Sequence, residues 1–440
     1  MKTAVKARSF VMVCVVTVWL VSSLSCGLPL SGPAPTADSP TATRTQAGES
    51  HATPKVSATQ APTATSAAST SEAAVAATES ATATLAPTRP SQPVVVASYC
   101  DLADCSQYTY PGDESNGIRG GTGGIMLAIP GQIWIANDFV GIQQWDPQTG
   151  KLVKTIANTV ENYFSDIKYD GQQVWVYALV LKQTSANSEY TGVLYAIDPL
   201  QGELVKKIDI PNEKKETISN NDAIGFPYIG VSPGKVWDKD RLIDTRTFEA
   251  TVMPWNFMFG TPIFAYDGQG MMWVEGDVPP GATQTIWIYD VNDPTKPLGK
   301  NGTAGLTSNP DLTDHHNLIM AGGKMWATAR YWKKVADQTS YWELLAYDIH
   351  PSDKPLFKTD ISKEMTGRNG GEILAADNHA IWLAPNGQDG KVYYYDQANG
   401  QLLGSLHVGA LIFSMSFDGQ NLWVMDDEHG LEKIALPWAP

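Results

Sequence analysis

Apolar residues in this chain recur as short runs of four to six positions, each containing one tryptophan and each preceded by a tight turn. Residues 132–136 (QIWIA) and 173–177 (QVWVY) are examples, rich in β-branched and aromatic side chains. Runs of this length are too short for a helix to bury a face, so they predict strands. Seven tryptophans occupy the recurring position: Trp134, Trp175, Trp237, Trp273, Trp326, Trp382 and Trp423.

A second apolar strand follows most of these tryptophans and ends in aspartate. An Asp at a strand end accepts backbone hydrogen bonds in a tight turn and passes the chain to the next antiparallel strand. Six repeats carry this signal: Asp146, Asp198, Asp244, Asp290, Asp348 and Asp396. With a strand before the turn, the Trp strand, the Asp strand and an outer edge, each repeat predicts a blade of four antiparallel strands. The chain is therefore expected to be an all-β, seven-bladed β-propeller, with the tryptophans filling the gaps between blades rather than stacking a ligand.

The expected blades cover roughly residues 120–158, 162–211, 222–256, 260–300, 315–362, 370–408 and 410–437. The last repeat has only three strands before the chain ends, which would leave an exposed sheet edge. Closing the ring is the usual remedy, and the apolar segment 93–98 lies upstream of the first blade. We expect this segment to supply the missing outer strand, so the propeller domain is placed at residues 93–440.

The N-terminus has the pattern of an export signal. Three cationic residues precede an apolar run at residues 9–21, long enough for a signal peptide and short for a spanning helix. The run leads to Ser25-Cys26-Gly27, which resembles the lipobox of bacterial lipoproteins, although Ser23 stands where that motif favours Leu. We predict a signal segment at residues 1–26 with lipidation at Cys26. Ordinary secretion with cleavage nearby and an uncleaved anchor are the alternatives.

Residues 27–92 consist largely of Thr, Ala, Ser and Pro. Such a tract has too little apolar area to offset its ordering entropy, so a disordered stalk is expected between anchor and propeller. Of the 31 Lys and Arg and 46 Asp and Glu, six and four precede residue 90, which leaves 25 and 42 in the rest. A surface of that sign repels nucleic acid and favours cationic ligands or divalent metals.

Two of the four cysteines, Cys100 and Cys105, lie five positions apart at the start of the predicted propeller. In an exported chain such a pair indicates a small-loop disulfide. A metal-binding or redox-active pair is the alternative, but Asp101 and Asp104 do not complete a convincing site for a soft metal.

The turn, the Trp strand and the Asp strand together resemble the seven-bladed propellers of the YVTN and quinoprotein-like class, which includes streptogramin lyase and NHL-type members. The resemblance covers residues 94–437 and rests on structural motifs that mark a blade, not a reaction. Adjacent cysteines are missing, and so is the tryptophan that quinoprotein dehydrogenases place shortly after Thr149-Gly150. Both absences argue against pyrroloquinoline quinone as a cofactor.

The lyase branch of that class uses His and Glu around a divalent cation at the channel mouth. The inner strand of each blade is expected to begin nine or ten positions before its tryptophan. Polar residues at or next to these positions would line the channel mouth, where they could bind a metal or act as acid and base: Asp166, His315, His316 and Glu372. A polar lining with ordered water is the alternative. No nucleophile or phosphate-binding motif occurs. The sequence therefore favours a lipid-anchored surface module that binds a protein, peptide or small molecule, with a metal-assisted lyase or hydrolase as the alternative.

Overall fold

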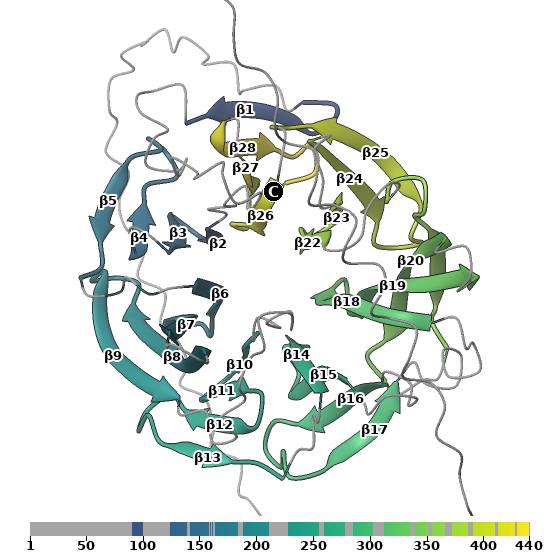
Figure 1. Cartoon of the computed structure of the whole chain (residues 1–440). Coiled ribbons are helices and arrows are strands. Elements are labelled where there is room, and N and C mark those ends of the chain that lie inside the picture. Colours follow the sequence, from purple (N-terminus) through teal and green to yellow (C-terminus); the bar gives the residue numbers. More distant parts are fainter. Residues whose placement is uncertain are drawn as a thin grey trace, which may run out of the picture. The chain divides into compact units, whose positions relative to one another are not determined.

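Seven sheets of four antiparallel strands surround a central axis (Figure 1), which confirms the predicted all-β, seven-bladed fold. The computed structural model describes residues 90–99, 124–138, 141–157, 159, 161, 163–183, 188–210, 228–254, 259–277, 285–301, 312–334, 339–350, 354–365, 372–385, 390–409, 412–426 and 429–439. Within these ranges, no helix combines the length and apolar character required to cross a membrane. Residues 1–89, which include Cys26 and nearly all of the predicted stalk, lie outside them, so these boundaries stay predictions.

Each blade is made of strands consecutive in sequence, running from the axis outwards in the first six blades. Blades 1 to 3 are β2 (Ile125–Ile129), β3 (Gln132–Asn137), β4 (Gly141–Trp145), β5 (Leu152–Thr155); β6 (Tyr163–Tyr169), β7 (Val174–Gln183), β8 (Ser188–Asp198), β9 (Glu203–Ile210); and β10 (Gly230–Ser232), β11 (Lys235–Asp238), β12 (Arg241–Asp244), β13 (Ala250–Val252). Blades 4 and 5 are β14 (Phe259–Tyr266), β15 (Met271–Asp277), β16 (Thr285–Asp290), β17 (Pro297–Asn301); and β18 (Leu312–Ala321), β19 (Lys324–Lys334), β20 (Thr339–Asp348), β21 (Phe357–Asp360). Blade 6 is β22 (Glu372–Ala376), β23 (Ala380–Pro385), β24 (Lys391–Asp396), β25 (Leu402–His407), and blade 7 contains β26 (Ile412–Phe417), β27 (Asn421–Asp426) and β28 (Gly430–Ala435).

The aspartates predicted to end the third strands do cap the turns that follow them. In all six, a carboxylate oxygen accepts the backbone N–H two residues later at 2.7–2.9 Å. A second set of aspartates caps the turn before the Trp strand and also binds the indole. Asp170, Asp377 and Asp418 each accept the Nε1–H of the tryptophan five residues later, at 2.9, 2.6 and 2.8 Å. In these three blades the hydrogen bond links the turn to the tryptophan that follows it.

Blade 4 departs from this spacing. Asp267 and Trp273 are separated by six residues because Gly270, at a φ of 113°, lengthens the turn. Asp267 still caps the backbone through Oδ1, which accepts the N–H groups of Gln269 and Met271. Its Oδ2 and the indole Nε1 of Trp273 are both buried without a hydrogen-bond partner among the described residues. One extra residue is enough to carry the indole out of reach of the carboxylate.

The seven tryptophans fill the gaps between blades, as expected. Each is fully buried and packs against the blade that follows it along the ring. Trp134 of blade 1 contacts the cluster that includes Ile167 and Val174 of blade 2. Trp423 of blade 7 lies in a cluster with Ile133 of blade 1. Burial of large rings at every interface, including the last, holds the ring closed.

The outer strand of the last blade comes from the N-terminal side of the propeller. β1 (Val94–Ser98) pairs antiparallel with β28, with Val94 opposite Ala435 and Ser98 opposite Glu432. This pairing confirms the predicted closure and covers an edge that would otherwise expose unpaired backbone groups. In Figure 1, β1 lies outside β28, although the two strands come from opposite ends of the described part of the chain.

Candidate functional site

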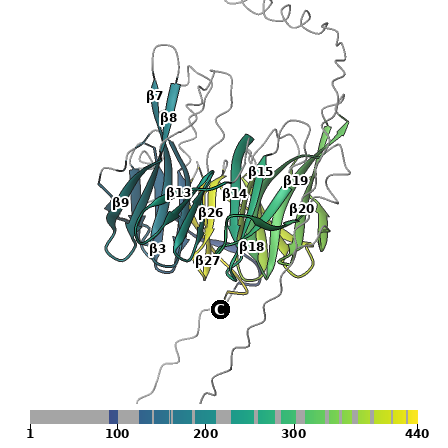
Figure 2. The same ribbon diagram turned by 90° about the horizontal axis from the view of Figure 1, so that it is seen from below.

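A cavity of about 620 Å³ occupies the centre of the ring. All seven inner strands contribute to its lining. Most lining residues are aliphatic or aromatic, but polar and apolar atoms contribute about equally to the lining surface. Among the described lining residues, the only charged ones are Asp166, Lys168 and Asp170 of blade 2. We define the top face as the face at which the inner strands begin; the β7–β8 hairpin extends from it (Figure 2).

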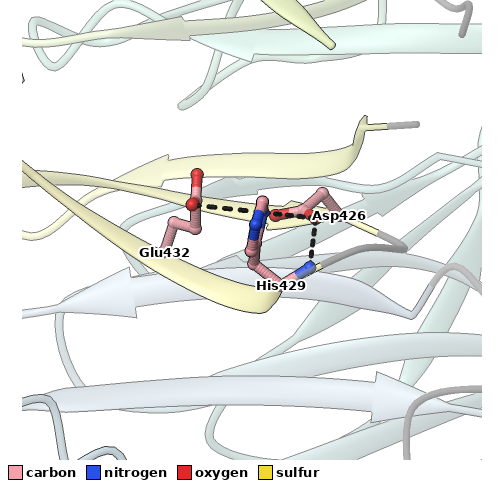
Figure 3. Close-up of side chains that lie close together, drawn as sticks. All are labelled: Asp426, His429 and Glu432. Atoms are coloured by element: carbon pink, nitrogen blue, oxygen red, sulfur yellow. Dashed lines mark hydrogen bonds and ion pairs between the residues drawn. The ribbon is translucent and has the colours of Figure 1, made fainter. Parts of the chain in front are cut away.

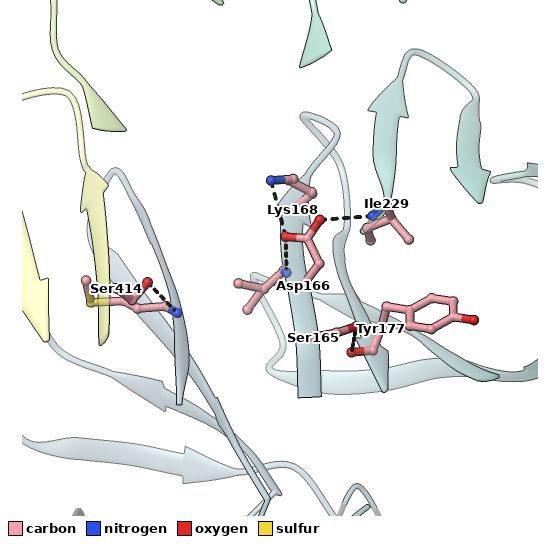
Figure 4. A network of polar contacts seen from close by, with 8 residues as sticks. Ser165, Asp166, Lys168, Tyr177, Ile229 and Ser414 are labelled. Atoms are coloured by element: carbon pink, nitrogen blue, oxygen red, sulfur yellow. Dashed lines mark hydrogen bonds and ion pairs between the residues drawn. The ribbon is translucent and has the colours of Figure 1, made fainter. Parts of the chain in front are cut away.

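Asp166 lies on the cavity, as its position in the sequence suggested, and its carboxylate is fully engaged. Its Oδ2 accepts the backbone N–H of Ile229 from the next blade at 2.9 Å, and its Oδ1 accepts that of Ile167 at 2.9 Å. The Nζ of Lys168 lies 3.2 Å from Oδ1. Figure 4 shows these contacts together. The carboxylate thus joins two inner strands and fixes a cation beside them.

The strand geometry accounts for this ion pair. Residues two apart on a strand lie on the same face, so Asp166 and Lys168 both project from the face of β6 that is turned towards blade 3. Burial raises the pKa of Asp166, and the Lys168 ammonium and the two backbone donors oppose that rise. The Lys168 side chain is 40% exposed, against 9% for that of Asp166. The charge presented to the cavity is therefore chiefly the ammonium.

The other predicted channel residues are placed only through their backbones. His315 and His316 lie inside β18 and Glu372 is the first residue of β22. The prediction that each position starts or precedes its strand is wrong for Asp166 and the two histidines, because β6 begins at Tyr163 and β18 at Leu312. Bulges after Phe164 and His315 let these strands continue past an irregular residue. The side chains of His315, His316 and Glu372 lie outside the described set, so their convergence stays a prediction.

The half-buried carboxylate of Asp138 and the buried one of Asp238 lie near the top face, and neither was predicted from the sequence. Asp138 follows β3, and its Oδ1 accepts the backbone N–H of Phe164 at the next inner strand at 2.8 Å. Asp238 ends β11 and is 2% exposed. Burial raises the pKa of each to about 6. Neither position carries a distinctive sequence signal, because the pKa shift depends on which atoms cover the carboxylate.

A second group of polar side chains lies on the β27–β28 hairpin of blade 7, well removed in sequence from Asp166. Ligand atoms of Asp426, His429 and Glu432 all lie within 4.8 Å of one another (Figure 3). This set was not predicted from the sequence. A carboxylate, an imidazole and a carboxylate at i, i+3 and i+6 across a hairpin turn would have been the signal.

Cys100 and Cys105 lie outside the described residues, so the disulfide also stays a prediction.

No known family matches the chain, and neither does any curated protein at the level of sequence. Solved structures do match in fold. A hydrazine synthase chain from Kuenenia stuttgartiensis superimposes with a TM-score of 0.52 at 11% identity over 72% of this chain and 97% of its own.

Two further structures match less closely. The designed protein Ika8 has a TM-score of 0.43 at 12% identity, covering 71% of this chain and 95% of its own. BamB from Moraxella catarrhalis has 0.41 at 10% identity, covering 70% and 84%. At such identities a likeness concerns the fold alone, because one propeller architecture supports many unrelated functions.

Proposed function

We propose that this chain is an exported, lipid-anchored protein of the bacterial cell surface whose propeller binds a small organic anion in its central cavity. The proposal of a binding site rests on the ion pair between Asp166 and Lys168 on the cavity wall. A volume of about 620 Å³ lies in the range of pockets that hold small organic molecules. No reaction is assigned to the site.

The chemistry of the ligand follows from how the pair is held. Both oxygens of Asp166 already accept backbone hydrogen bonds, so the carboxylate orients Lys168 rather than facing a ligand. The Lys168 side chain is partly exposed, and its ammonium group retains N–H donors for a second anion. Tyr169, Tyr228 and Phe413 add aromatic surface to the lining. A carboxylate attached to a body with both polar and apolar groups matches this combination of one cation and a wall that is about half polar and half apolar.

The net negative charge of the propeller does not exclude an anionic ligand. At physiological ionic strength, exposed charges are screened over about 8 Å, so distant carboxylates act weakly inside the channel. They would slow the approach of an anion more than they would weaken its final contact with Lys168.

We expect replacement of Lys168 by Gln to weaken anion binding by about tenfold or more, since a hydrogen bond to a charged group contributes about 1.5–3 kcal/mol. Gln can still donate to Asp166, so the buried carboxylate keeps a partner. Calorimetric titration of the purified chain with succinate, glutamate, benzoate and a neutral sugar measures the effect. Lys206→Gln, exposed on β9, is the matched control. Equal affinities for wild type and Lys168→Gln, or no binding of any anion, would contradict the proposed site.

The anchor is tested separately. We expect Cys26→Ser to move the chain from the membrane fraction to the soluble fraction while the propeller still folds, because a stalk of about 65 residues would separate the two. Fractionation of expressing bacteria, with circular dichroism of the released chain, measures both outcomes. If the variant stays with the membrane, the apolar segment 9–21 is itself the anchor.

A further inference from the structure

Blade 7 holds three metal-ligating side chains on one hairpin. Asp426 is the last residue of β27, His429 lies in the turn, and Glu432 is the third residue of β28. In the ladder, Asp426 is opposite Gly430 and Val424 is opposite Glu432. Asp426 and Glu432 are thus diagonal neighbours on one face of the hairpin, and the turn brings His429 over them (Figure 3). Because second-to-third strand hairpins lie at the top face, the group faces the same side as the channel mouth.

The distances within the group fit metal ligands better than hydrogen bonds. His429 Nδ1 lies 3.6 Å from Asp426 Oδ1 and 3.4 Å from Glu432 Oε1. Both exceed the usual 2.7–3.2 Å of an N–H···O hydrogen bond. Ligand bonds of about 2.0–2.2 Å at tetrahedral angles separate neighbouring ligand atoms by about 3.4 Å. Among the described residues, the Nδ1 atom of His429 is shielded from solvent and forms no hydrogen bond.

Neighbouring groups already hold the carboxylates in position. The backbone N–H of His429 donates to Asp426 Oδ1 at 2.7 Å, and the hydroxyl of Ser98 donates to Glu432 Oε1 at 3.1 Å. Asp426 and Glu432 are only 2% and 3% exposed. Two carboxylates buried this close repel each other, and a divalent cation between them offsets the repulsion. Outer hydrogen bonds that orient the ligands are typical of protein metal sites.

We propose that Asp426, His429 and Glu432 bind one divalent transition metal ion of the zinc class. One imidazole nitrogen with two carboxylate oxygens suits Zn²⁺ and its neighbours, whereas Ca²⁺ and Mg²⁺ prefer sites made of oxygen alone. Three protein ligands leave a coordination position for water or a ligand, and the His429 side chain is 33% exposed. Ser98 belongs to β1, so the bound metal also braces the closing strand of the ring. The metal site lies on blade 7 and Lys168 lies on blade 2, so a test of metal binding does not depend on whether an anion binds at Lys168.

Metal binding by the purified full chain tests the proposal. After removal of metal with a chelator, we expect wild type to bind one more equivalent of Zn²⁺ than His429→Ala, measured by calorimetry and elemental analysis. His350→Ala is the matched control, because His350 pairs with Asp348 at 2.8 Å and has no third ligand within the described part of the chain. The comparison between variants removes the contribution of other histidines and cysteines. Equal zinc content in wild type and His429→Ala would overturn the proposal.

Two further measurements keep the test decisive if one variant folds poorly. Glu432→Gln retains the shape of the side chain and is expected to weaken Zn²⁺ binding by about tenfold or more. Zn²⁺ is expected to raise the melting temperature of wild type and not that of either site variant. Stabilisation by Ca²⁺ or Mg²⁺ equal to that by Zn²⁺ would overturn the assignment to a transition metal. Visible absorption of Co²⁺ bound at tetrahedral geometry in wild type, displaced by Zn²⁺, would support it.

Discussion

Deletion of residues 91–99 is expected to lower the melting temperature of the chain by about 5–10 °C, whereas deletion of residues 30–88 leaves it nearly unchanged. The first deletion removes β1, and with it the pairing to β28 and the hydrogen bond from Ser98 to Glu432. It also removes Tyr99, whose ring stacks on Trp423 with centroids 5.9 Å apart. Loss of these contacts exposes the edge of β28 to solvent.

Thermal unfolding followed by circular dichroism at several protein concentrations measures this effect. The exposed edge should also make the shorter chain aggregate at concentrations at which wild type stays soluble. The 30–88 deletion is the matched control, because it removes more residues but none of the strands that the structure describes. If the two deletions melt at the same temperature, the β1–β28 pairing contributes little to stability.

Replacement of Trp423 by Ala is expected to destabilise the propeller by about 3–5 kcal/mol. The ring is fully buried at the interface where the last blade meets the first, and its Nε1–H donates to Asp418 at 2.8 Å. The substitution leaves a cavity, and Oδ2 of Asp418 keeps only the longer hydrogen bond from Asn421 Nδ2 at 3.3 Å. Lys433, whose Nζ lies 5.3 Å from the ring centroid, loses its contact as well.

Denaturant unfolding of wild type, Trp423→Ala and Leu200→Ala measures the difference in free energy of unfolding. Leu200 is 83% exposed, so its truncation should change stability by no more than about 0.5 kcal/mol. Trp423→Phe should fall between the two, because it fills most of the volume but offers no N–H to Asp418. A cost below about 1 kcal/mol for Trp423→Ala would mean that the interface repacks without the ring.

Local signals accounted for the blades because turn chemistry acts over a few residues. The carboxylate of Asp418 reaches the N–H groups of Gln420 and Asn421 and the indole of Trp423 within five positions. The same spacing fails in blade 4, where the single insertion at Gly270 separates Asp267 from the indole of Trp273. A sequence pattern identifies the strand in both cases, but it does not reveal which hydrogen bond is lost.

The residues of the candidate sites were harder to predict from local sequence patterns. Asp166 was predicted from its distance to Trp175, while Lys168, its partner two residues later on the same strand, was missed. The N–H that binds the second oxygen of Asp166 belongs to Ile229, on another blade. His429 and Glu432 meet Asp426 only because the β27–β28 register makes the two carboxylates diagonal neighbours. Such contacts between strands and between blades depend on the register and packing of the folded ring, which no short sequence pattern reveals.

The sequence by itself determined the strand content, the number of blades and the use of residues 93–98 to complete the last one, because these depend on turn residues and on the alternation of apolar positions. Only the tertiary structure decided which polar groups face the cavity, which are buried, and which come together from different strands. Burial and proximity arise when blades pack around a common axis. The pKa of Asp238 rises to about 6 because surrounding atoms exclude water from its carboxylate, and this environment exists only in the closed ring.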